Sequence, residues 1–389
     1  MRRHGKTIKV LHCPKNVVGN PSSLARAERE LGLNSWSISF TDDSFIMNSD
    51  EVLWNKDDNV LIREMKRWQF AWRALTEFDI IHYNFGQSIM PKWYPAKIIE
   101  KQYPNIVLIK LYQLYASIFE LKDLWLYKKA GKVIVVTYQG DDARQGDYCK
   151  RNFNITFSNE VDSDYYLPED DNHKRWEISK FAEYADRIYS LNPDLLHVLP
   201  PQAQFLPYAH VYLDEWRVPS NINTNKSRPL VIHAPTERSV KGTRYILDAV
   251  SRLHSEGLQF DFQLIEGLQQ HEARKIYGNA DVLVDQLLAG WYGGLAVELM
   301  ALGKPVICYI RESDLKFIPE EMKSDIPIIN SDPGSIYDVL KDYLTSSKSQ
   351  LKKIGEKSRS YVEKWHNPSK IALRLKRDYL EILKERNLI

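Results

Sequence analysis

Apolar and polar residues in the first half of the chain follow the rhythm of repeated strand–helix units. Short apolar runs predict strands at residues 9–12, 35–40, 78–83, 106–110, 132–138 and 188–191. Amphipathic stretches between them predict helices at residues 21–31, 59–75, 93–101, 112–130 and 175–184. An acidic, aromatic stretch at residues 159–173 interrupts the series. Strands that alternate with helices form parallel sheets, so the pattern predicts a Rossmann-like α/β domain.

A second series of the same kind occupies the C-terminal half. It predicts strands at residues 230–233, 260–265, 281–285 and from 305 onward, and helices at 243–255, 270–277, 295–302, 349–364 and 369–388. Residues 216–228, between the two series, are rich in Pro, Ser, Asn and Thr, a composition typical of a linker. We therefore expect an N-terminal domain at 1–215, a linker at 216–228, a C-terminal domain at 229–368 and a terminal helix at 369–389.

The stretch from Asp285 to Ile307 carries the strongest chemical signal. A buried strand ends at Asp285, a loop with glycines at 290, 293 and 294 follows, and a short helix begins at Leu295. Glycines let backbone N–H groups approach an anion, and the helix start adds its positive dipole end. The helix is otherwise built from Ala, Val, Leu and Met, so Glu298 is a lone carboxylate that is costly to bury without a partner. We interpret Glu298 as a ligand contact; the alternative is that it caps loop N–H groups or pairs with an arginine.

The segment from His233 to Thr243 is the second signal. A strand ends in Pro235, a polar loop with Arg238 and Lys241 follows, and Thr243 is predicted to be the N-cap of the next helix. Arginine forks onto phosphate oxygens and lysine acts as a point charge, so two cations at a helix start suit a diphosphate. The alternative is an ordinary solvated loop between a strand and a helix.

The run Gly-Gly-Leu-Ala-Val-Glu-Leu-Met-Ala-Leu-Gly-Lys-Pro-Val-Ile, which ends at Ile307, resembles the nucleotide-sugar signature of GT-B glycosyltransferases. The resemblance is to their large retaining family, glycosyltransferase family four, which includes sucrose synthases, mannosyltransferases and transferases of the bacterial polysaccharide type. It implies the GT-B fold, an α/β fold with two Rossmann-like domains facing a central cleft and a C-terminal helix that crosses back to the N-terminal domain. It also implies that Glu298 holds the donor ribose and that Lys241 neutralises the donor diphosphate. Arg238 is closer to Lys241 than in the family's usual spacing.

The same resemblance implies further donor contacts. Gly267 follows the strand at 260–265, where the family places residues beside the nucleotide base. One position departs from the family, which usually carries two glutamates seven residues apart, because the first of them falls at Gly290 here. Asp285 is the acid that can substitute for it, and a strand-end aspartate that caps or packs is the alternative. The full set of implied donor contacts is Gly19, Arg238, Lys241, Gly267, Gly290, Gly293, Gly294, Leu295 and Glu298.

Three strand ends in the N-terminal half carry polar or glycine-bearing segments. The first contains Gly19 and looks like the family's glycine loop beneath the donor phosphates, with one glycine in place of two. The second contains His82, and the third contains Asp141 close to Gln139, which stands where the family often has histidine. We predict His82 as an active-site imidazole and Asp141 as a sugar-hydroxyl acceptor or acceptor-side base, each with a structural role as the alternative. The predicted catalytic set is His82, Asp141, Lys241 and Glu298.

Composition narrows the class of protein. The net charge of the 389 residues is only +2 and no nucleic-acid motif appears, which speaks against dedicated nucleic-acid binding. The three cysteines are widely spaced, which favours a reducing cytoplasm, and no apolar run approaches the ~20 residues that cross a bilayer. Asp162 and Asp164 match the short metal-binding pattern of the other glycosyltransferase fold, GT-A. We interpret them as part of a surface loop, and we expect neither a metal nor a cofactor beyond the donor substrate.

Residues 86–132 concentrate positive charge, with eight lysines and three acidic residues. Tryptophans and tyrosines are interleaved with the lysines, a combination that suits the surface of an anionic membrane. The segment therefore predicts peripheral membrane contact and a lipid-linked acceptor; a solvated face over ordinary core helices is the alternative.

The resemblance to family four implies a metal-independent, retaining hexosyltransferase that uses a UDP or GDP sugar and acts in polysaccharide biosynthesis. Its acceptor is predicted to be a glycan or a lipid-linked sugar. Two alternatives stay open. One is a non-catalytic GT-B subunit that binds a glycan or a partner, which Gly290 and Gln139 permit. The other is a GT-B enzyme of another reaction, a nucleotide-sugar epimerase or a phosphorylase.

Overall fold

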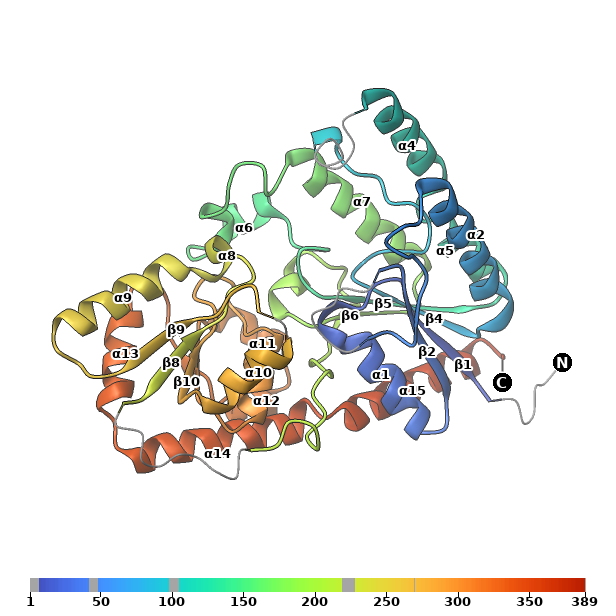
Figure 1. The fold of residues 1–389 in the computed structure, drawn as a ribbon. Helices are drawn as coiled ribbons and strands as arrows, with labels where there is room; N and C mark the ends of the chain where they lie inside the picture. The colour runs from blue at the N-terminus through green and yellow to red at the C-terminus, as the bar shows by residue number, and fades with distance from the viewer. Residues whose placement is uncertain (1–6, 42–47, 98–104, 219–227, 269, 389) are drawn as a thin grey trace. The chain divides into compact units, whose positions relative to one another are not determined.

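The computed structural model describes residues 7–41, 48–97, 105–218, 228–268 and 270–388. The chain forms two compact units (Figure 1). Unit 1 comprises Met1–Gln145, Tyr166–His210 and Pro368–Ile389, and unit 2 comprises Gly146–Tyr165 and Val211–Asn367. Each unit has its own parallel sheet and its own hydrophobic core.

Unit 1 is built on a parallel sheet. Its described strands are β1 (Lys9–Cys13), β2 (Asn34–Ser39), β3 (Glu51–Val52), β4 (Ile80–Asn84), β5 (Val133–Tyr138), β6 (Arg187–Ser190) and β7 (Gln204–Phe205). They lie in the order β3-β2-β1-β4-β5-β6-β7. From β1 the chain adds strands toward one edge of the sheet, and from β4 it adds them toward the other edge, so the direction of connection reverses between β1 and β4. At this centre Val10 pairs with Ile80, and Ile80 pairs with Val133 on its other side.

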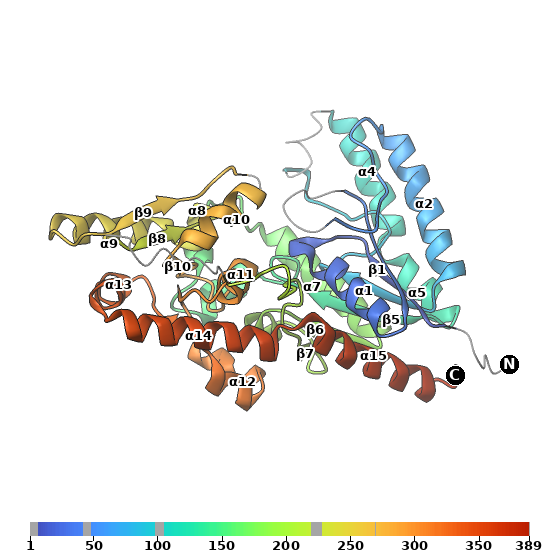
Figure 2. The same cartoon turned by 60° about the horizontal axis from the view of Figure 1, so that its bottom comes forward.

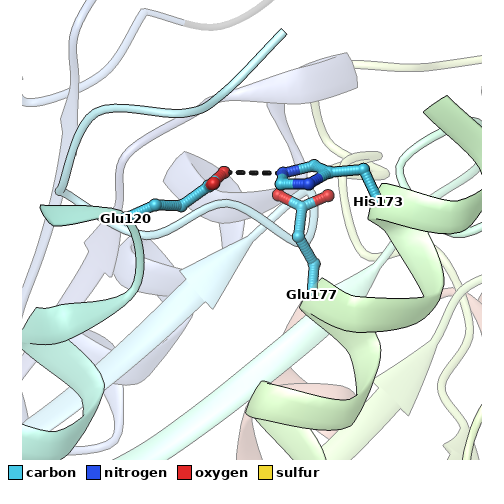
Figure 3. Close-up of side chains that lie close together, drawn as sticks. All are labelled: Glu120, His173 and Glu177. Carbon is cyan, nitrogen blue, oxygen red and sulfur yellow. Dashed lines mark hydrogen bonds and ion pairs between the residues drawn. The ribbon is translucent and has the colours of Figure 1, made fainter. Parts of the chain in front are cut away.

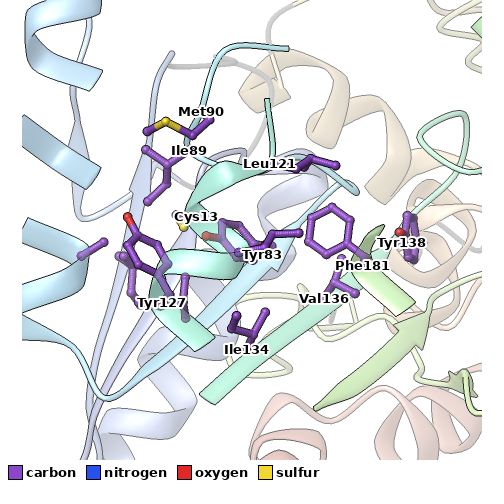
Figure 4. Close-up of a cluster of buried hydrophobic side chains, with 14 of the residues drawn as sticks. Cys13, Tyr83, Ile89, Met90, Leu121, Tyr127, Ile134, Val136, Tyr138 and Phe181 are labelled. Carbon is purple, nitrogen blue, oxygen red and sulfur yellow. The ribbon is translucent and has the colours of Figure 1, made fainter. Parts of the chain in front are cut away.

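Helices cover both faces of this sheet. Its longer described helices are α1 (Asn20–Glu30), α2 (Val60–Glu77), α4 (Ile106–Phe119), α5 (Lys122–Lys129), α7 (Pro168–Tyr184) and α15 (Pro368–Glu385). Successive strand residues point to opposite faces. Leu11, Ile81 and Ile134 point to the face covered by α2, α5 and α7, where Tyr127 and Phe181 pack against the sheet (Figure 4). Helices α1 and α15 pack together on the other face (Figure 2).

Unit 2 has a smaller sheet of the same kind. Its described strands are β8 (Leu230–His233), β9 (Asp261–Leu264), β10 (Val282–Val284), β11 (Val306–Cys308) and β12 (Ile329–Asn330), in the order β12-β11-β10-β8-β9. Its described helices are α6 (Gly146–Asn152), α8 (Arg238–Lys241), α9 (Thr243–Ser255), α10 (Gln270–Asn279), α11 (Gly294–Ala301), α12 (Glu320–Asp325), α13 (Ile336–Thr345) and α14 (Lys348–Trp365). Val231, Val282 and Ile307 form the centre of its core. Such strands are almost entirely apolar because both of their faces are buried.

The predicted alternation of strands and helices is confirmed, with one strand wrong. Helix α9 begins and ends at the predicted residues, whereas residues 106–110 form the start of α4 and not a strand. Asn105 caps this helix because its side chain accepts hydrogen bonds from the N–H groups of Val107 and Leu108, at 3.0 and 3.3 Å. A short apolar run fits a strand and a buried helix equally well, so periodicity could not separate them.

Two predicted helices have different limits in the structure. The helix predicted at 112–130 is divided into α4 and α5 because Leu121 adopts a left-handed conformation with φ 58°. Helix α7 begins at Pro168, ahead of the predicted residue 175, since proline suits a first turn and the acidic residues that follow favour the helix dipole. Of the helix predicted at 93–101, residues 96–97 are helical and 98–101 lie outside the described residues. Residues 219–227 of the predicted linker also lie outside them.

The terminal helix α15 belongs to unit 1. The Lys376 ammonium of α15 donates a hydrogen bond to the Leu31 carbonyl at 2.6 Å, and Arg187 pairs with Glu381 at 2.9 Å. The segment 146–165 belongs to unit 2, although the sequence pattern placed it in the N-terminal domain. Arg311 donates a hydrogen bond to the Ile155 carbonyl at 3.0 Å, and such contacts between distant parts of the chain leave no mark in the local pattern.

Candidate functional site

The order of strands in unit 2 indicates where a ligand binds. β8 is the first strand of the sheet, β9 lies on one side of it and β10 on the other, so the order of connection reverses between β8 and β10. Parallel α/β sheets bind ligands beside the loops that leave the carboxyl ends of two such strands. In unit 2 these are the loop from His233 to Thr243 and the loop from Asp285 to Gly294. They are the two segments that carry the strongest signals in the sequence.

Lys241 joins the two loops. Its ammonium group donates hydrogen bonds to Asp285 Oδ1 at 2.8 Å and to Gln286 Oε1 at 2.7 Å. The other carboxylate oxygen of Asp285 accepts a hydrogen bond from the backbone N–H of Gly293 at 3.1 Å. The Lys241 side chain is 12% exposed and that of Asp285 is 1% exposed, so water screens this ion pair only weakly. One network therefore joins the predicted cation Lys241, the acid Asp285 and the loop that contains Gly293. Gln286, a member of that network, was not predicted.

The glycine loop continues into α11. A Cβ atom at Gly293 would lie 3.5 Å from Lys241 Nζ, so this position keeps the backbone close to the cation. Gly294 is buried as the first residue of α11, and Leu295 is half-buried next to it. Glu298 lies one turn further along and is only 5% exposed. Burial, followed by the negative charges of Glu298 and Asp285, raises the pKa of Tyr277.

An arginine occupies the space beside Gly290, where the family has its first glutamate. Gly290 has φ +84°, and a Cβ atom there would lie 2.6 Å from Arg311 Nη1. Arg311 is held from several sides: it donates a hydrogen bond to Asp314 at 2.9 Å, and its guanidinium lies 3.7 Å from the centre of the Phe153 ring. No side chain fits at residue 290 in this arrangement. The sequence shows that the glutamate is missing but does not show what stands in its place.

Arg238 lies apart from the Lys241 network. Its guanidinium donates a hydrogen bond to Glu266 Oε1 at 2.8 Å, and the two side chains are 58% and 35% exposed. Gly267 follows Glu266 with φ +67° and has no atom within 4 Å of its Cβ position. The two cations that the sequence grouped as one diphosphate cradle therefore have different partners, because Arg238 is paired across to the loop after β9.

The start of α9 differs from the prediction that Thr243 is its N-cap. Gly242 is the N-cap, in the left-handed conformation with φ 75°. Thr243 instead places its hydroxyl 2.9 Å from His233 Nε2, and His233 Nδ1 donates a hydrogen bond to the Val284 carbonyl at 2.7 Å. Burial lowers the pKa of His233 to about 4, so the neutral ring ties β8 to β10 directly beneath the two loops.

In unit 1 the order of strands reverses between β1 and β4, and Gly19 follows the first of these strands. It has φ 67° and forms the N-cap of α1, while the Ser22 hydroxyl donates a hydrogen bond to its carbonyl at 3.0 Å. The loop after β4 contains Gly86, where a Cβ atom would lie 2.6 Å from the Tyr138 ring. Both glycines allow turns that other residues adopt only with strain.

His82 has a structural position, which corrects the prediction of a catalytic imidazole. It has no exposed surface, and its ring nitrogens lie 2.7 Å from the Tyr379 hydroxyl and 2.7 Å from the Thr137 hydroxyl. Burial and the neighbouring His12 lower the pKa of His82, so it is neutral. The side chain points from the middle of β4 toward α15, and it therefore connects the sheet to that helix.

The loop after β5 holds the two adjacent aspartates Asp141 and Asp142. Asp141, the predicted acceptor-side group, accepts hydrogen bonds from Arg144 at 2.9 Å and from the Tyr166 hydroxyl at 2.7 Å, and its side chain is 36% exposed. Asp142 accepts a hydrogen bond from the Gly140 N–H at 2.6 Å, and burial raises its pKa to about 6. Asp142 therefore shapes the loop, and Asp141 remains accessible at its surface.

The side chain of Gln139, at the start of the same loop, has unsatisfied hydrogen-bonding capacity. It is 7% exposed, and within the described parts of the chain neither its side-chain nitrogen nor its side-chain oxygen has a hydrogen-bond partner. An unpaired buried amide costs about 1–3 kcal/mol. A ligand or a water molecule at this carboxyl edge of the sheet would satisfy the amide. The sequence marked this residue only as a departure from the family's histidine.

One group of side chains in unit 1 has the composition of a metal site. Within the described residues, Glu120, His173 and Glu177 bring their ligand atoms within 4.8 Å of one another (Figure 3). His173 Nε2 lies 3.0 Å from Glu120, and Lys92 donates a hydrogen bond to Glu177 at 2.7 Å. Lys92 already supplies a positive charge to this cluster, which favours an ion-pair network. Asp162 and Asp164, the pair that the sequence suggested, lie in a turn in unit 2, where the Tyr165 N–H donates to the Asp162 carbonyl at 3.0 Å.

Among the described residues, no helix combines the length and the apolar character that a membrane crossing requires. Comparison of the sequence with protein-family models and with curated proteins gives no match.

Comparison of the fold with solved structures gives many matches. A sucrose-phosphate synthase from Thermosynechococcus elongatus superposes with a TM-score of 0.57 at 14% identity, covering 98% of this chain and 100% of that one. An alpha-glucosyltransferase in complex with UDP and a 13-mer DNA superposes with a TM-score of 0.58 at 12% identity, covering 96% and 99%. A protein from Listeria monocytogenes described as a UDP-N-acetylglucosamine 2-epimerase has a TM-score of 0.50 at 12% identity and covers 98% of both chains. Over nearly its whole length the chain therefore has the GT-B fold, with two Rossmann-like units.

Proposed function

We propose that this protein is a glycosyltransferase that binds the diphosphate of a nucleotide sugar on unit 2. The observation that carries the proposal is the network of Lys241, Asp285 and Gly293, which lies where the strand order of unit 2 reverses. A weakly screened cation beside a glycine loop and the start of α11 suits a diphosphate. The resemblance of the run that ends at Ile307 to the nucleotide-sugar signature of family four, and UDP in the similar alpha-glucosyltransferase structure, support the same class of ligand.

Donor binding changes the partners of Lys241 in this proposal. The ammonium group keeps one contact to Asp285 and turns the other toward a phosphate oxygen, while N–H groups of the glycine loop face the same phosphates. Glu298 accepts hydrogen bonds from the ribose hydroxyls. Glu298 is only 5% exposed, and a ribose diol can donate two charge-assisted hydrogen bonds to its carboxylate.

The reaction transfers the sugar with retention of configuration and without a metal ion. Negative charge accumulates on the leaving diphosphate as the glycosidic bond breaks, and Lys241 together with the loop N–H groups stabilises it. Unit 1 binds the acceptor, a glycan or a lipid-linked sugar, at the loop after β5. Gln139 pairs its buried amide with a sugar hydroxyl, and Asp141 accepts a hydrogen bond from the acceptor hydroxyl. We place this activity in polysaccharide biosynthesis at the cytoplasmic face of a membrane.

Arg311 beside Gly290 favours one alternative function. The family's first glutamate is absent, and a guanidinium occupies the space next to its position. A protein that kept nucleotide-sugar binding but lost transfer would tolerate this change. The alternative is therefore a non-catalytic GT-B binding subunit, and an epimerase is the other GT-B activity to exclude. Release of a free or transferred sugar in one anomeric form supports transfer, whereas a changed sugar still attached to the nucleotide supports epimerisation.

Replacing Glu298 by glutamine should weaken UDP and GDP binding about ten- to hundredfold while leaving the melting temperature nearly unchanged. The substitution keeps the shape of the side chain and removes the charge that strengthens its hydrogen bonds to the ribose, a loss of about 1.5–3 kcal/mol. Isothermal titration with UDP, GDP and the corresponding ribose-modified deoxynucleotides measures the effect. Deoxynucleotides should bind the variant and the native protein alike. Equal affinity of both proteins for UDP and GDP would remove Glu298 from the donor site.

Turnover of the native protein should persist in EDTA, because the proposed site stabilises the diphosphate with Lys241 and backbone N–H groups and not with a metal ion. Loss of turnover in EDTA would contradict the metal-independent reaction.

Replacing Gln139 by methionine should separate stability from activity. The variant removes an unpaired buried amide from unit 1, so the free energy of unfolding should rise by about 1 kcal/mol or more. Sugar transfer should fall at least tenfold, with nucleotide affinity unchanged, because Gln139 lies on the acceptor unit. Urea denaturation, titration with nucleotide and an assay of sugar release measure the three quantities. Full activity in the variant would show that the amide has no ligand.

A further inference from the structure

The outer surfaces of α2 and α4 expose large apolar side chains. On α2 these are Val60, Leu61, Met65, Trp68 and Trp72, and on α4 they are Ile106, Val107, Leu108, Leu111, Leu114 and Ile118. Their exposed fractions range from 43% at Trp68 to 81% at Leu61. Single exposed apolar residues are ordinary, but a contiguous apolar surface indicates an interface. The exposed apolar residues of the two helices are referred to below as the α2/α4 face.

Helical spacing makes each set a continuous stripe. Most of the α2 residues recur at 61, 65, 68 and 72, and most of the α4 residues recur at 107, 111, 114 and 118. Positions three and four apart lie on one side of a helix. The opposite sides carry the buried residues, such as Phe70 and Ala74 on α2 and Ile109 and Ala116 on α4. Each helix is therefore apolar on two sides, and its second apolar side is exposed.

Contacts between the helices join the two stripes. The Trp68 indole N–H donates a hydrogen bond to the Tyr115 hydroxyl at 2.8 Å, and that hydroxyl donates to Glu64 Oε2 at 2.8 Å. Trp68 also meets the Phe119 ring edge-on, with the ring centres 5.1 Å apart. Both views show α2 and α4 side by side on the outside of unit 1 (Figures 1 and 2). The two stripes therefore form one surface with Trp68 at its seam.

The charges on the α4 and α5 side of this face are positive, whereas α2 carries Glu64 and Glu77 paired with Arg67 and Arg73. Lys110 is the charged residue of α4, and α5 presents Lys122 and Lys129 on its outer side. Lys129 Nζ lies 4.3 Å from the centre of the Trp125 ring, which is itself 46% exposed. The acidic residues of residues 106–130 are buried, with Glu120 5% and Asp123 2% exposed. This stretch therefore exposes lysines and no carboxylate.

We propose that the α2/α4 face lies in the interface of an anionic membrane. A helix of 14 residues such as α4 is about 21 Å long, suited to lying along a membrane surface with its apolar side buried and lysines toward the headgroups. A second copy of the chain is the competing occupant. A symmetric dimer would bring this face against itself and the lysines of α4 and α5 near the same lysines, while Glu64 and Glu77 of α2 already pair with Arg67 and Arg73.

The structure assigns the membrane contact to different residues from those that the sequence pattern suggested. The sequence pattern suggested the tyrosines and tryptophans of residues 86–132, but Tyr127 has no exposed surface and donates a hydrogen bond to the Ala71 carbonyl at 2.8 Å. The exposed apolar surface comes instead from the aliphatic residues of α4 and from α2, which lies outside that segment. The inference refines the acceptor side of the proposed function, since a lipid-linked acceptor would be reached from this surface.

Co-sedimentation with vesicles tests the proposal. Native protein should pellet with vesicles that contain phosphatidylserine at low salt, and should stay in the supernatant with phosphatidylcholine vesicles. Replacing Leu111 and Leu114 by glutamine should lower binding at least tenfold, because both side chains are more than half exposed and their burial would be lost. Replacing Lys110, Lys122 and Lys129 by glutamate should lower vesicle binding at least a hundredfold, because each lysine near an anionic surface contributes about 1 kcal/mol of attraction.

Matched controls keep these outcomes specific. Leu373, 47% exposed on α15, is replaced by glutamine as the apolar control. Lys352, Lys353 and Lys357 on α14 are replaced by glutamate to give the same change in net charge. Both controls should bind vesicles like the native protein. Equal recovery in the supernatant with both kinds of vesicle, or a dimer that the glutamine variants convert to a monomer, would overturn the proposal. Nucleotide titration needs no vesicle, so a protein that fails to bind vesicles can still bind a nucleotide on unit 2. Likewise, a protein that fails to bind nucleotides can still bind vesicles, so the two experiments test the two proposals separately.

Discussion

Replacing Lys241 by alanine should lower the free energy of unfolding of unit 2 by about 3 kcal/mol and should abolish measurable nucleotide binding. Asp285 is 1% exposed and pairs with Lys241 at 2.8 Å, so the variant leaves a buried carboxylate without its cation. Breaking a buried ion pair by removing one partner costs about 3–5 kcal/mol. Urea denaturation followed by tryptophan fluorescence, and titration with UDP, measure the two effects.

A second substitution separates the two roles of Lys241. Asparagine at position 285 removes the stranded charge and keeps an oxygen to accept the Gly293 N–H, so the combined Lys241→Ala and Asp285→Asn variant should regain most of the lost stability. It should still fail to bind UDP, because the phosphates have lost their cation. Recovery of both stability and binding in the double variant would show that Lys241 only neutralises Asp285. Retention of native UDP affinity in the Lys241→Ala variant would also contradict the site.

Introducing a side chain at Gly290 should destabilise unit 2 and should not restore the family's glutamate contact. The φ angle of +84° alone costs about 1–2 kcal/mol for a residue with a Cβ atom. That atom would also lie 2.6 Å from Arg311 Nη1 and 2.7 Å from its Cζ, and overpacking adds about 1–3 kcal/mol. Arg311 is 7% exposed and bonded to Asp314, so it has little room to yield. The Gly290→Ala variant should therefore lose about 3 kcal/mol in urea denaturation, and Gly290→Glu at least as much.

Gly257 provides the matched control in the same unit. Its φ angle of +85° is nearly the same, and no atom lies within 4 Å of its Cβ position. The Gly257→Ala variant should therefore show only the backbone cost, about 1–2 kcal/mol. A loss at Gly290 no larger than that at Gly257 would mean that Arg311 moves aside easily. Position 290 would then be open to a glutamate, and the alternative of a non-catalytic subunit would lose its main support.

Much of the fold followed from local chemistry that the sequence displays. The alternation of apolar runs with amphipathic stretches indicated two parallel sheets, because strand and helix periods are set within a few residues. Helix α9 begins and ends at the predicted residues, since its apolar positions repeat at helical spacing and Gly242 and Gly257 lie at its two ends. The loops that carry Lys241 and Gly293 were also recognisable, because each follows a strand and precedes a helix. A parallel sheet with this order of connection brings such loops together.

The partners of the site residues depended on the tertiary structure. His82 bonds to Tyr379, 297 residues away, because α15 packs against the sheet of unit 1, and this burial removes it from the predicted catalytic set. Arg238 pairs with Glu266 after the neighbouring strand, and Arg311 occupies the space beside Gly290. Local periodicity determines which face of a strand or helix is apolar, whereas the residues that meet across that face come from distant segments. Their charges and shapes become partners only when the helices and loops pack against the sheets.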